Sequence, residues 1–263
     1  RHKPVIKTGY KSSTYTDSAW SSGLAQTKLL PFTAWGSSAG DFNNDGFLDL
    51  YVANGMIQPD GDSYFVAQAQ QNSLFINQRN GQFKLSNGTN AAQHPYSSRG
   101  VISVDLNNDG KLELVVTNNN DSLQILENEI SNEHTWFGLD LLSVNAPSDV
   151  YGAVLKVSTD LFTFKRTLGA NQSFLSQGDP RIHIGLGDSK DIKALNIRWP
   201  DGQVSTFENL KPNQYFTINK AGNALSPIQR EQTELTNKSP SLKQLNEAAL
   251  IAYSKVLLQA PNG

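Results

Sequence analysis

The sequence contains no cysteine among its 263 residues. That absence excludes a disulfide framework, a thiolate metal site and a cysteine nucleophile. No apolar run approaches the roughly 20 residues that a membrane-spanning helix requires. The net charge of −2 and the pI near 6.1 give no basic surface for nucleic acid or an anionic membrane. We therefore expect neither a nucleic-acid partner nor a membrane span.

The composition is that of a folded chain, with 38% hydrophobic and 17% charged residues. Its length suffices for one large domain or two smaller ones. Asn, Ser, Thr and Gly are plentiful and Met occurs once, which favours a polar, β-rich, exported protein. Because the chain begins with Arg1, we expect that a signal peptide or a longer region has been removed. The expected location is secreted, at the cell surface or periplasmic.

Two β-rich segments dominate the chain. From residue 35 to 130, short runs of Val, Ile, Leu, Phe and Thr alternate with polar residues and are separated by Asn, Gly and Asp. A different β segment follows, in which Asp201-Gly202 predicts a hairpin. Near the end, apolar residues recur at helical spacing. The expected organisation is a first β domain over 1–130, a second β domain over 131–222, a linker over 223–239 and an amphipathic helix over 240–260.

An internal repeat organises the first segment. DFNNDGFLDLYVANG begins at Asp41, and VDLNNDGKLELVVTN contains its counterpart from Asp105. Each copy has side-chain oxygens at positions 1, 3, 5 and 9, a glycine for a sharp turn at position 6 and a usable carbonyl at position 7. Oxygen ligands on a flexible loop suit Ca²⁺ better than Zn²⁺. The expected ligands are Asp41, Asn43, Asp45, the Phe47 carbonyl and Asp49 for one ion, and Asp105, Asn107, Asp109, the Lys111 carbonyl and Glu113 for a second.

The charge of these loops also favours a cation. Three carboxylates converge in each, and like charges about 4–6 Å apart repel by roughly one to a few kcal/mol at effective dielectrics of about 20–80. The alternative is that Asp, Asn and Gly form turns without a metal. We expect no His, Arg or Lys to be aimed into either loop. A structural staple is therefore favoured over catalysis or sensing.

These loop-plus-strand units resemble FG-GAP/VCBS repeats, the blades of integrin-α-type β-propellers. The segment from about 150 to 218, with GAVLKV, FLSQGDPRIHIGLGD and IRWPDGQ, resembles the ASPIC/UnbV domain. Together they are similar to the cartilage acidic protein family, whose animal members carry cysteines, so a bacterial origin is expected here. The resemblance implies an exported, calcium-binding, non-enzymatic protein that meets a protein or glycan ligand at a surface. It also implies propeller blades followed by a β-sandwich-like domain and a C-terminal helix.

The sequence departs from this family in two places. A propeller ring usually needs four to eight blades, yet only two loops are present, and TYTDSAWSSGLA (14–25) resembles the end of an earlier, incomplete blade. Either this chain is a fragment, or further blades come from the same precursor or another chain, or the architecture is altered. The end, AALIAYSKVLLQAPNG, resembles the second helix of a tetratricopeptide repeat. It also fits an ordinary amphipathic helix.

A histidine, a glycine pair, an Asp-Gly-Asp turn, the serines and the tryptophans could each belong to a functional site or have a purely structural role. His183 has acidic and basic neighbours, but its β pattern favours a structural strand histidine over an acid/base centre. Gly185-Leu186-Gly187 lacks the continuation of a nucleotide loop, Asp60-Gly61-Asp62 fits a turn better than a metal ligand, and the serines lack a nucleophile elbow. A sugar-stacking platform would need Trp20, Trp35, Trp136 and Trp199 exposed together. Two further function classes stay open: a structural subunit of a surface filament or complex, and an accessory part of a polysaccharide-binding or -processing protein.

Overall fold

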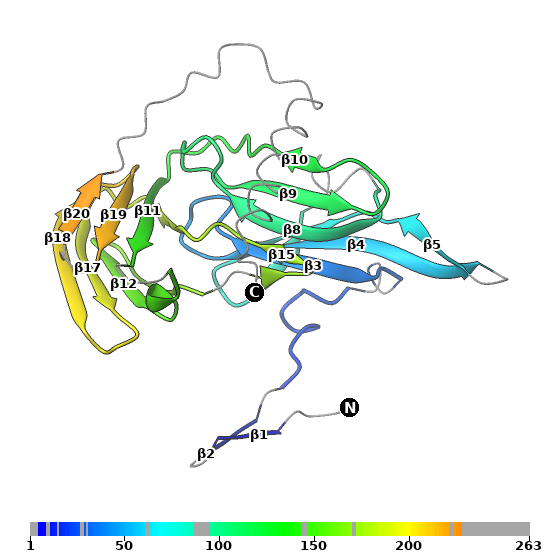
Figure 1. Ribbon diagram of the computed structural model, residues 1–263, viewed down its shortest axis with the longest axis horizontal. Coiled ribbons are helices and arrows are strands. Elements are labelled where there is room, and N and C mark those ends of the chain that lie inside the picture. The colour runs from blue at the N-terminus through cyan, green and yellow to red at the C-terminus, as the bar shows by residue number, and fades with distance from the viewer. Residues whose placement is uncertain are drawn as a thin grey trace, which may run out of the picture. The chain divides into compact units, whose positions relative to one another are not determined.

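The computed structural model is mainly β, as the sequence predicted (Figure 1). Helical structure in the described part of the chain is limited to short 3-10 turns such as η2 (Pro147–Val150). The expected helix over 240–260 and most of the linker over 223–239 lie outside the described residues. An N-terminal hairpin pairs β1 (Val5–Thr8) with β2 (Lys11–Thr14). The structure describes residues 5–8, 11–14, 16–26, 29, 31–60, 64–86, 95–143, 147–169, 172–220 and 224–227.

The first large sheet has the strand order β3-β4-β6-β7, the antiparallel four-stranded form of a propeller blade. Along β4, Tyr51 and Ala53 are fully buried and the residue between them is not, which is the period-two pattern of a strand with one core-facing side. The far half of β4 extends past this sheet and pairs with β5. The bounds are β3 (Ala34–Gly40), β4 (Asp49–Asp60), β5 (Tyr64–Ala69), β6 (Ser73–Asn77) and β7 (Phe83–Leu85).

The second sheet repeats the first three strands of this design in the order β10-β9-β8. Strand β8, the first of this sheet along the chain, lies beside β3, and there the hydroxyls of Ser38 and Ser103 are 3.0 Å apart. Side chains of both sheets, including Tyr51 and Val101, form one apolar core. The two sheets do not close a ring, so the predicted partial propeller is confirmed. The bounds are β8 (Ser98–Val104), β9 (Glu113–Asn118) and β10 (Gln124–Leu126).

The segment 14–25 resembles the end of an earlier blade, but its described residues from 16 onward form turns and irregular structure rather than a strand. The Ser22 backbone N–H donates to the Ser18 carbonyl at 2.8 Å, so the segment bends back on itself. The Ser22 carbonyl in turn accepts the N–H of Phe83 at 2.7 Å. This segment therefore covers part of the outer edge of β7, where an unpaired strand would otherwise expose its backbone.

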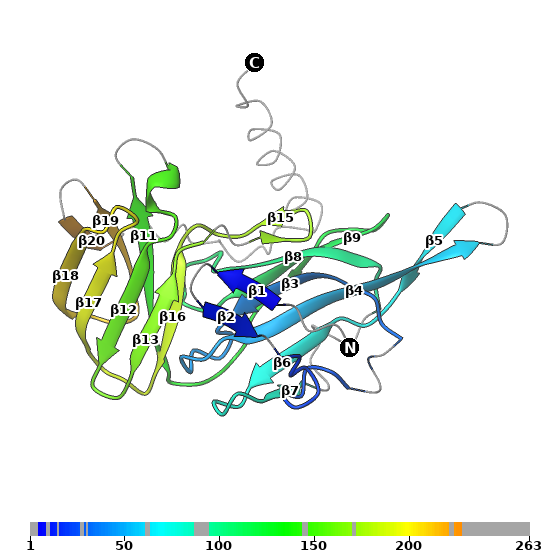
Figure 2. The ribbon, with the colours of Figure 1, turned by 90° about the horizontal axis from the view of Figure 1, so that it is seen from below.

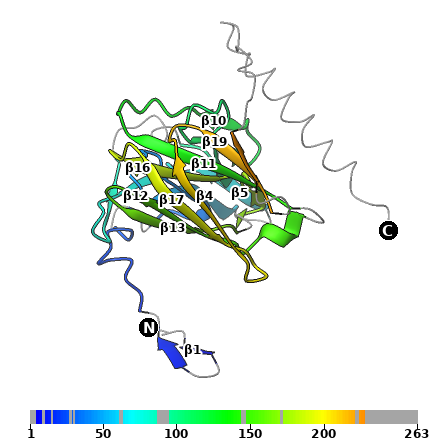
Figure 3. The ribbon, with the colours of Figure 1, turned by 90° about the vertical axis from the view of Figure 1, so that its left-hand side faces the viewer.

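The chain from residue 135 forms a sandwich of two four-stranded sheets, ordered β16-β11-β19-β20 and β13-β12-β17-β18 (Figures 2 and 3). Leu139, Leu155 and Ile184 are fully buried in the apolar core that both sheets share. Asp201-Gly202 turns β17 into β18 with Gly202 at φ +88°, which confirms the predicted hairpin. The strands are β11 (Thr135–Leu142), β12 (Val154–Thr159), β13 (Thr163–Thr167), β16 (Ile182–Gly187), β17 (Ile192–Arg198), β18 (Val204–Leu210), β19 (Tyr215–Asn219) and β20 (Ala224–Pro227).

The last of these strands lies inside the stretch predicted to be linker. β20 pairs antiparallel with β19, from Phe216 opposite Pro227 to Asn219 opposite Ala224. The sandwich thus extends past the expected boundary at residue 222. Four residue pairs join β20 to the sheet, although the composition of the same stretch predicts a polar, irregular linker.

A short hairpin leaves the sandwich and lies against β3 and β8. Glycine makes room for it at the same position of both repeats. A Cβ on Gly36 would lie 2.6 Å from the Ser173 hydroxyl oxygen, and a Cβ on Gly100 would collide with the hydroxyl of Ser176. The sandwich is therefore fastened to the two blades at their adjoining strands. The hairpin consists of β14 (Gln172–Ser173) and β15 (Ser176–Gln177).

Candidate metal loops and the interface they form

Loop 1 (residues 41–49) joins β3 to β4 and is closed by its own side chains. One carboxylate oxygen of Asp41 accepts the N–H of Asp45 at 2.9 Å, and the other accepts the N–H of Gly46 at 2.8 Å. Asp45 accepts the N–H of Phe47 at 2.9 Å, and the Asn43 side-chain oxygen accepts that of Asp45 at 3.1 Å. Gly46 has φ +92°, as expected for the sharp turn. The repeated pattern thus places all these oxygens around one tight loop.

The last acidic residue of loop 1 fastens the loop to its blade. Asp49 is 1% exposed, and its two carboxylate oxygens accept the N–H of Phe42 at 3.1 Å and that of Asn77 at 2.8 Å. Asn77 belongs to β6, so this contact ties the loop to the third strand of the sheet. The second Asp45 oxygen accepts the Nε–H of Arg79. Every carboxylate oxygen of Asp41, Asp45 and Asp49 thus accepts at least one N–H.

Loop 2 (residues 105–113) repeats the geometry with one difference. Asp105 accepts the N–H of Gly110 at 2.9 Å, Asp109 accepts that of Lys111 at 2.8 Å, and Gly110 has φ +84°. However, Asp105 Oδ1 and Glu113 Oε1 are both sealed from solvent and have no hydrogen-bond donor among the residues that the structure describes. A buried carboxylate oxygen without a partner is costly. A cation bound in loop 2 would contact these two oxygens and compensate their charge.

Burial raises the pKa of two acidic groups in each loop, the first and the last. The pKa of Asp41 rises to about 6, and the pKa values of Asp49 and Glu113 rise to about 7. Burial also raises the pKa of Asp105. Neighbouring carboxylates of the same loop add to each shift, whereas backbone N–H donors oppose it. Near pH 7 Asp49 and Glu113 are therefore only partly ionised unless a cation compensates their charge.

The donor atoms fit a hard cation, more fully in loop 2 than in loop 1. Loop 2 offers two sealed oxygens with no donor, in an oxygen-only environment. In loop 1 each carboxylate oxygen already accepts an N–H, so an ion would use the remaining lone pairs. Within the described ranges, no three His, Asp or Glu side chains gather into one metal-holding group. A site in either loop would therefore depend on asparagine and backbone oxygens as well.

The expectation that no His, Arg or Lys is aimed into either loop was wrong. Arg79 Nε donates to Asp45 Oδ2 in loop 1 at 3.0 Å. Arg166 Nη2 donates to the carbonyl of Gly46 at 2.9 Å. Arg181 Nη2 donates to the carbonyl of Asp105 in loop 2 at 2.7 Å. These side chains lie 34 or more residues from their partners in sequence, so local spacing gave no sign of them.

Both loops pack on the sandwich through their position-6 glycines. A Cβ on Gly46 would collide with the ring of Phe164, and a Cβ on Gly110 would collide with the indole of Trp136. Gly185 in β16 makes the reciprocal approach, because a Cβ there would collide with the Asp41 carboxylate. The glycine that permits the turn is therefore also the glycine that permits contact between the two domains.

Two proposed metal ligands bond directly to the sandwich. Asp41 Oδ2 accepts the backbone N–H of Gly185 at 3.1 Å, and Asp105 Oδ2 accepts the hydroxyl of Tyr215 at 2.9 Å. The two loops also touch each other, because the Asn44 side chain donates to the carbonyl of Gly110 at 2.8 Å. Any change of charge in the loops thus acts on the domain interface.

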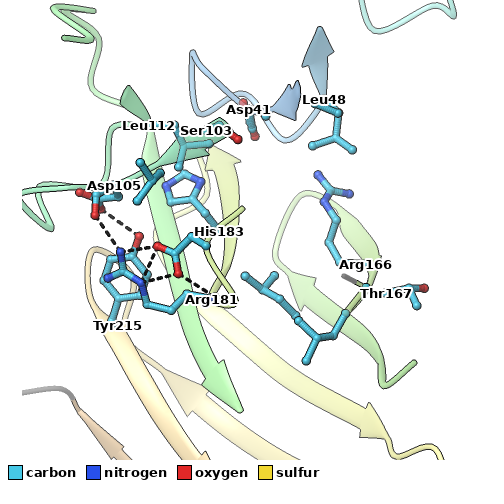
Figure 4. A pocket seen from close by; sticks show the side chains of 17 residues that line it. Asp41, Leu48, Ser103, Asp105, Leu112, Arg166, Thr167, Arg181, His183 and Tyr215 are labelled. Atoms are coloured by element: carbon cyan, nitrogen blue, oxygen red, sulfur yellow. Dashed lines mark hydrogen bonds and ion pairs between the residues drawn. The ribbon is translucent and has the colours of Figure 1, made fainter. Parts of the chain in front are cut away.

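A pocket of about 180 Å³ lies between the loops and the sandwich (Figure 4). Asp41 and Asp105 line it from the blades, and Arg166 and Arg181 line it from the sandwich on opposite sides. Arg181 also forms an ion pair with Asp179. Acidic groups from the blades thus face basic groups from the sandwich across this space.

The structure places His183 inside this interface. Its Nε2 lies 3.0 Å from the carbonyl of Gly110, and its ring stacks on Trp136 with centroids 5.7 Å apart. Burial, assisted by the charges of Arg181 and Arg166, lowers its pKa to about 4. A neutral ring that donates from Nε2 fits a structural strand histidine, the plain reading favoured by the sequence.

The other features singled out in the sequence lie apart from one another. Trp20 is 61% exposed, whereas Trp199 is 1% exposed and donates to the Ser205 hydroxyl at 2.9 Å. Trp136 is buried against loop 2, and Trp35 contacts Phe174 of the hairpin. The four tryptophans thus do not form one exposed platform. Gly61 and Asp62 lie outside the described residues.

Sequence reasoning missed Gly185, Arg181 and Tyr215. The first two belong to the string FLSQGDPRIHIGLGD, in which glycines interrupt an apolar strand. A glycine inside a strand often marks the close approach of another backbone. That signal was present, but it does not say which backbone approaches.

Comparisons with known proteins match two kinds of family model to different parts of the chain. The model of the FG-GAP repeat matches residues 33–66, and that of the FG-GAP-like repeat matches residues 60–116. The model named ASPIC and UnbV matches residues 144–225. No curated protein matches the chain. Among the described residues, no helix has the length and apolar character to cross a membrane.

Proposed function

This chain is a protein of FG-GAP repeats and an ASPIC/UnbV domain, and from that premise we propose that it is an exported, calcium-binding, non-enzymatic adhesion or assembly module. Its repeats and second domain mark a repeat module of adhesion type. The expected ligand is a protein or glycan at a surface. Further blades, from the same precursor or another chain, would complete the ring.

One observation carries the calcium part of this proposal. The loops that would hold the ions are also the surface on which the ASPIC/UnbV domain packs, through Asp41 with Gly185 and Asp105 with Tyr215. Bound calcium would supply positive charge beside these carboxylates, whose pKa values burial raises. The residues of this chain then hold blade and sandwich in one arrangement. The proposed holders are Asp41, Asn43, Asp45, the Phe47 carbonyl and Asp49, and Asp105, Asn107, Asp109, the Lys111 carbonyl and Glu113.

Calcium affinity is expected to fall as the pH is lowered from 7.5 to 5.5. The metal-free pKa values of Asp49 and Glu113 are about 7, so protons compete with calcium below that pH. We expect the dissociation constants to rise about ten-fold or more, measured by isothermal titration calorimetry of chelator-treated protein with CaCl₂. Affinities that do not change with pH would contradict the assignment of these carboxylates, and absence of binding would contradict the calcium sites.

The sign for stability follows from the same shifts. The folded pKa values of Asp49 and Glu113 are raised above their ordinary values of 3.8 and 4.5. Their contribution to the stability of metal-free protein is therefore complete below about pH 4 and is lost as the pH rises toward about 7. In calcium this loss is expected to be offset, because bound cations replace the protons. Chemical denaturation of metal-free and calcium-containing samples at about pH 4 and about pH 7 measures the free energies of unfolding that check this expectation.

The adhesion part of the proposal needs a separate test. Beads coated with the chain are expected to be retained on a glycan array or a protein-coated surface in millimolar calcium and released by EGTA, because the chelator loosens the domain interface. Beads coated with the Asp45→Ala/Asp109→Ala variant serve as the matched control. Equal retention with and without EGTA, or cleavage of the array glycans, would contradict a calcium-dependent, non-enzymatic adhesion module.

A further inference from the structure

The two loops differ in the charge that surrounds them. Loop 1 contains an ion pair between Arg79 and Asp45, with Nε and Oδ2 3.0 Å apart. At the equivalent position of loop 2, Asp109 has no basic partner within ion-pair distance among the described residues. Two carboxylate oxygens of loop 2 have no donor, whereas every one in loop 1 has one.

The position of Arg79 is fixed by its turn. Asn77 anchors that turn to loop 1 twice, through its N–H to Asp49 and through its side-chain amide to the carbonyl of Leu48 at 3.0 Å. The Asn77 side-chain oxygen also accepts the N–H of Arg79 at 2.9 Å. Arg79 itself has φ +63°, a conformation that a long side chain adopts at some cost. The backbone thus holds the guanidinium at the mouth of the loop.

The exposures of the two partners differ, and this decides how the pair can open. The Asp45 side chain is 5% exposed, whereas that of Arg79 is 50% exposed. Asp45 is fixed inside the loop, whereas the half-exposed Arg79 can turn into solvent. The buried Asp45 carboxylate then keeps only the N–H groups of Phe47 and the Asn43 side chain as donors, so calcium would replace the guanidinium charge. The guanidinium also lies over the Phe47 ring, 5.9 Å from its centroid.

We propose that Arg79 is an internal counter-ion of loop 1 that competes with calcium for Asp45. The inference rests on the proposed calcium function and adds an order of filling. Loop 2 binds first, because its carboxylates have no internal cation at this position. Loop 1 binds at higher calcium concentration, after Arg79 has moved away from Asp45. One chain thus holds a tight site and a weaker site built from nearly the same motif.

The test compares Arg79→Gln with Arg79→Lys, with Arg198→Gln as a matched control because Arg198 is exposed in the sandwich. Chelator-treated protein is titrated with CaCl₂ by calorimetry at low ionic strength. The wild type is expected to show two steps. Arg79→Gln should tighten the weaker step about five-fold, the scale of a partly exposed ion pair, and leave the tighter step unchanged. Arg79→Lys and Arg198→Gln should keep the wild-type values.

Terbium identifies the loop. Trp136 contacts loop 2 at Gly110, whereas Phe164 is the aromatic at Gly46 of loop 1. Tryptophan-sensitised luminescence is therefore expected to report terbium bound in loop 2. Calcium should displace this terbium, and abolish the luminescence, in the tighter step for the wild type and for Arg79→Gln alike. Two steps that Arg79→Gln leaves unchanged, or a change in the step that the luminescence follows, would overturn the role of Arg79. Absence of calcium binding would overturn the proposed function itself.

Discussion

Chelation of calcium with EGTA is expected to lower the midpoint of thermal unfolding by about 3–15 °C. Ions bound only by the folded chain stabilise it according to their concentration and affinity. At about 2 mM calcium and dissociation constants of about 10⁻⁴–10⁻³ M, two sites contribute about 1–4 kcal/mol. Differential scanning calorimetry with and without EGTA measures the shift.

The Asp45→Ala/Asp109→Ala variant is expected to unfold at the same temperature with and without EGTA. These residues stand at position 5 of each loop, so both proposed sites lose a carboxylate. Asp160→Ala provides a matched control, because Asp160 is exposed and lies outside the loops. That variant should keep the full response. An EGTA shift that survives the double substitution would show that these loops are not the source of the calcium effect.

Substitution of Gly110 by alanine is expected to be more destabilising than substitution of Gly202. Both glycines have positive φ, +84° and +88°, so the backbone strain of alanine is similar at the two sites. At Gly202 nothing lies within 4 Å of the new Cβ, whereas at Gly110 the Cβ would collide with the indole of Trp136. We expect a loss of about 1 kcal/mol for Gly202→Ala and about 1–3 kcal/mol more for Gly110→Ala.

Chemical denaturation gives these free energies, and tryptophan fluorescence reports the contact at Trp136. In Gly110→Ala the emission is expected to move to longer wavelength, because the indole is displaced from its buried position. Gly202→Ala should leave the spectrum unchanged. Equal losses of stability for the two variants would mean that loop 2 does not press on the sandwich as described, and that the glycine serves the turn alone.

The loops and the sheet types were predictable because their signals are local. A glycine at position 6, oxygens at alternate positions and a period-two strand all lie within about a dozen residues of Asp41. The arrangement of the domains was not predictable in this way. Gly185 meets Asp41 across 144 residues of sequence, and Arg166 meets Gly46 across 120. Spacing along the chain contains no information about such pairs.

Arg79 shows a second kind of limit. It belongs to the same repeat as loop 1, so its distance in sequence is modest. Its direction depends on a positive φ in a turn that Asn77 fixes, and composition alone favours glycine or asparagine at such a place. For Arg79, the expectation of loops without basic partners was wrong for this reason. A charged side chain was visible in the sequence, but its aim was not.

The hairpin of Gln172–Gln177 determines what would fill the centre of a complete ring. The first strands of neighbouring blades border the central channel of a propeller, and the hairpin lies against two of them, β3 and β8. A ring completed by further blades would therefore close around protein instead of an open passage. At both strands that the hairpin contacts, a glycine leaves the room, Gly36 beside Ser173 and Gly100 beside Ser176. In such a ring the sandwich would therefore contribute the Gln172–Gln177 hairpin to the centre, beside the first strands of these two blades.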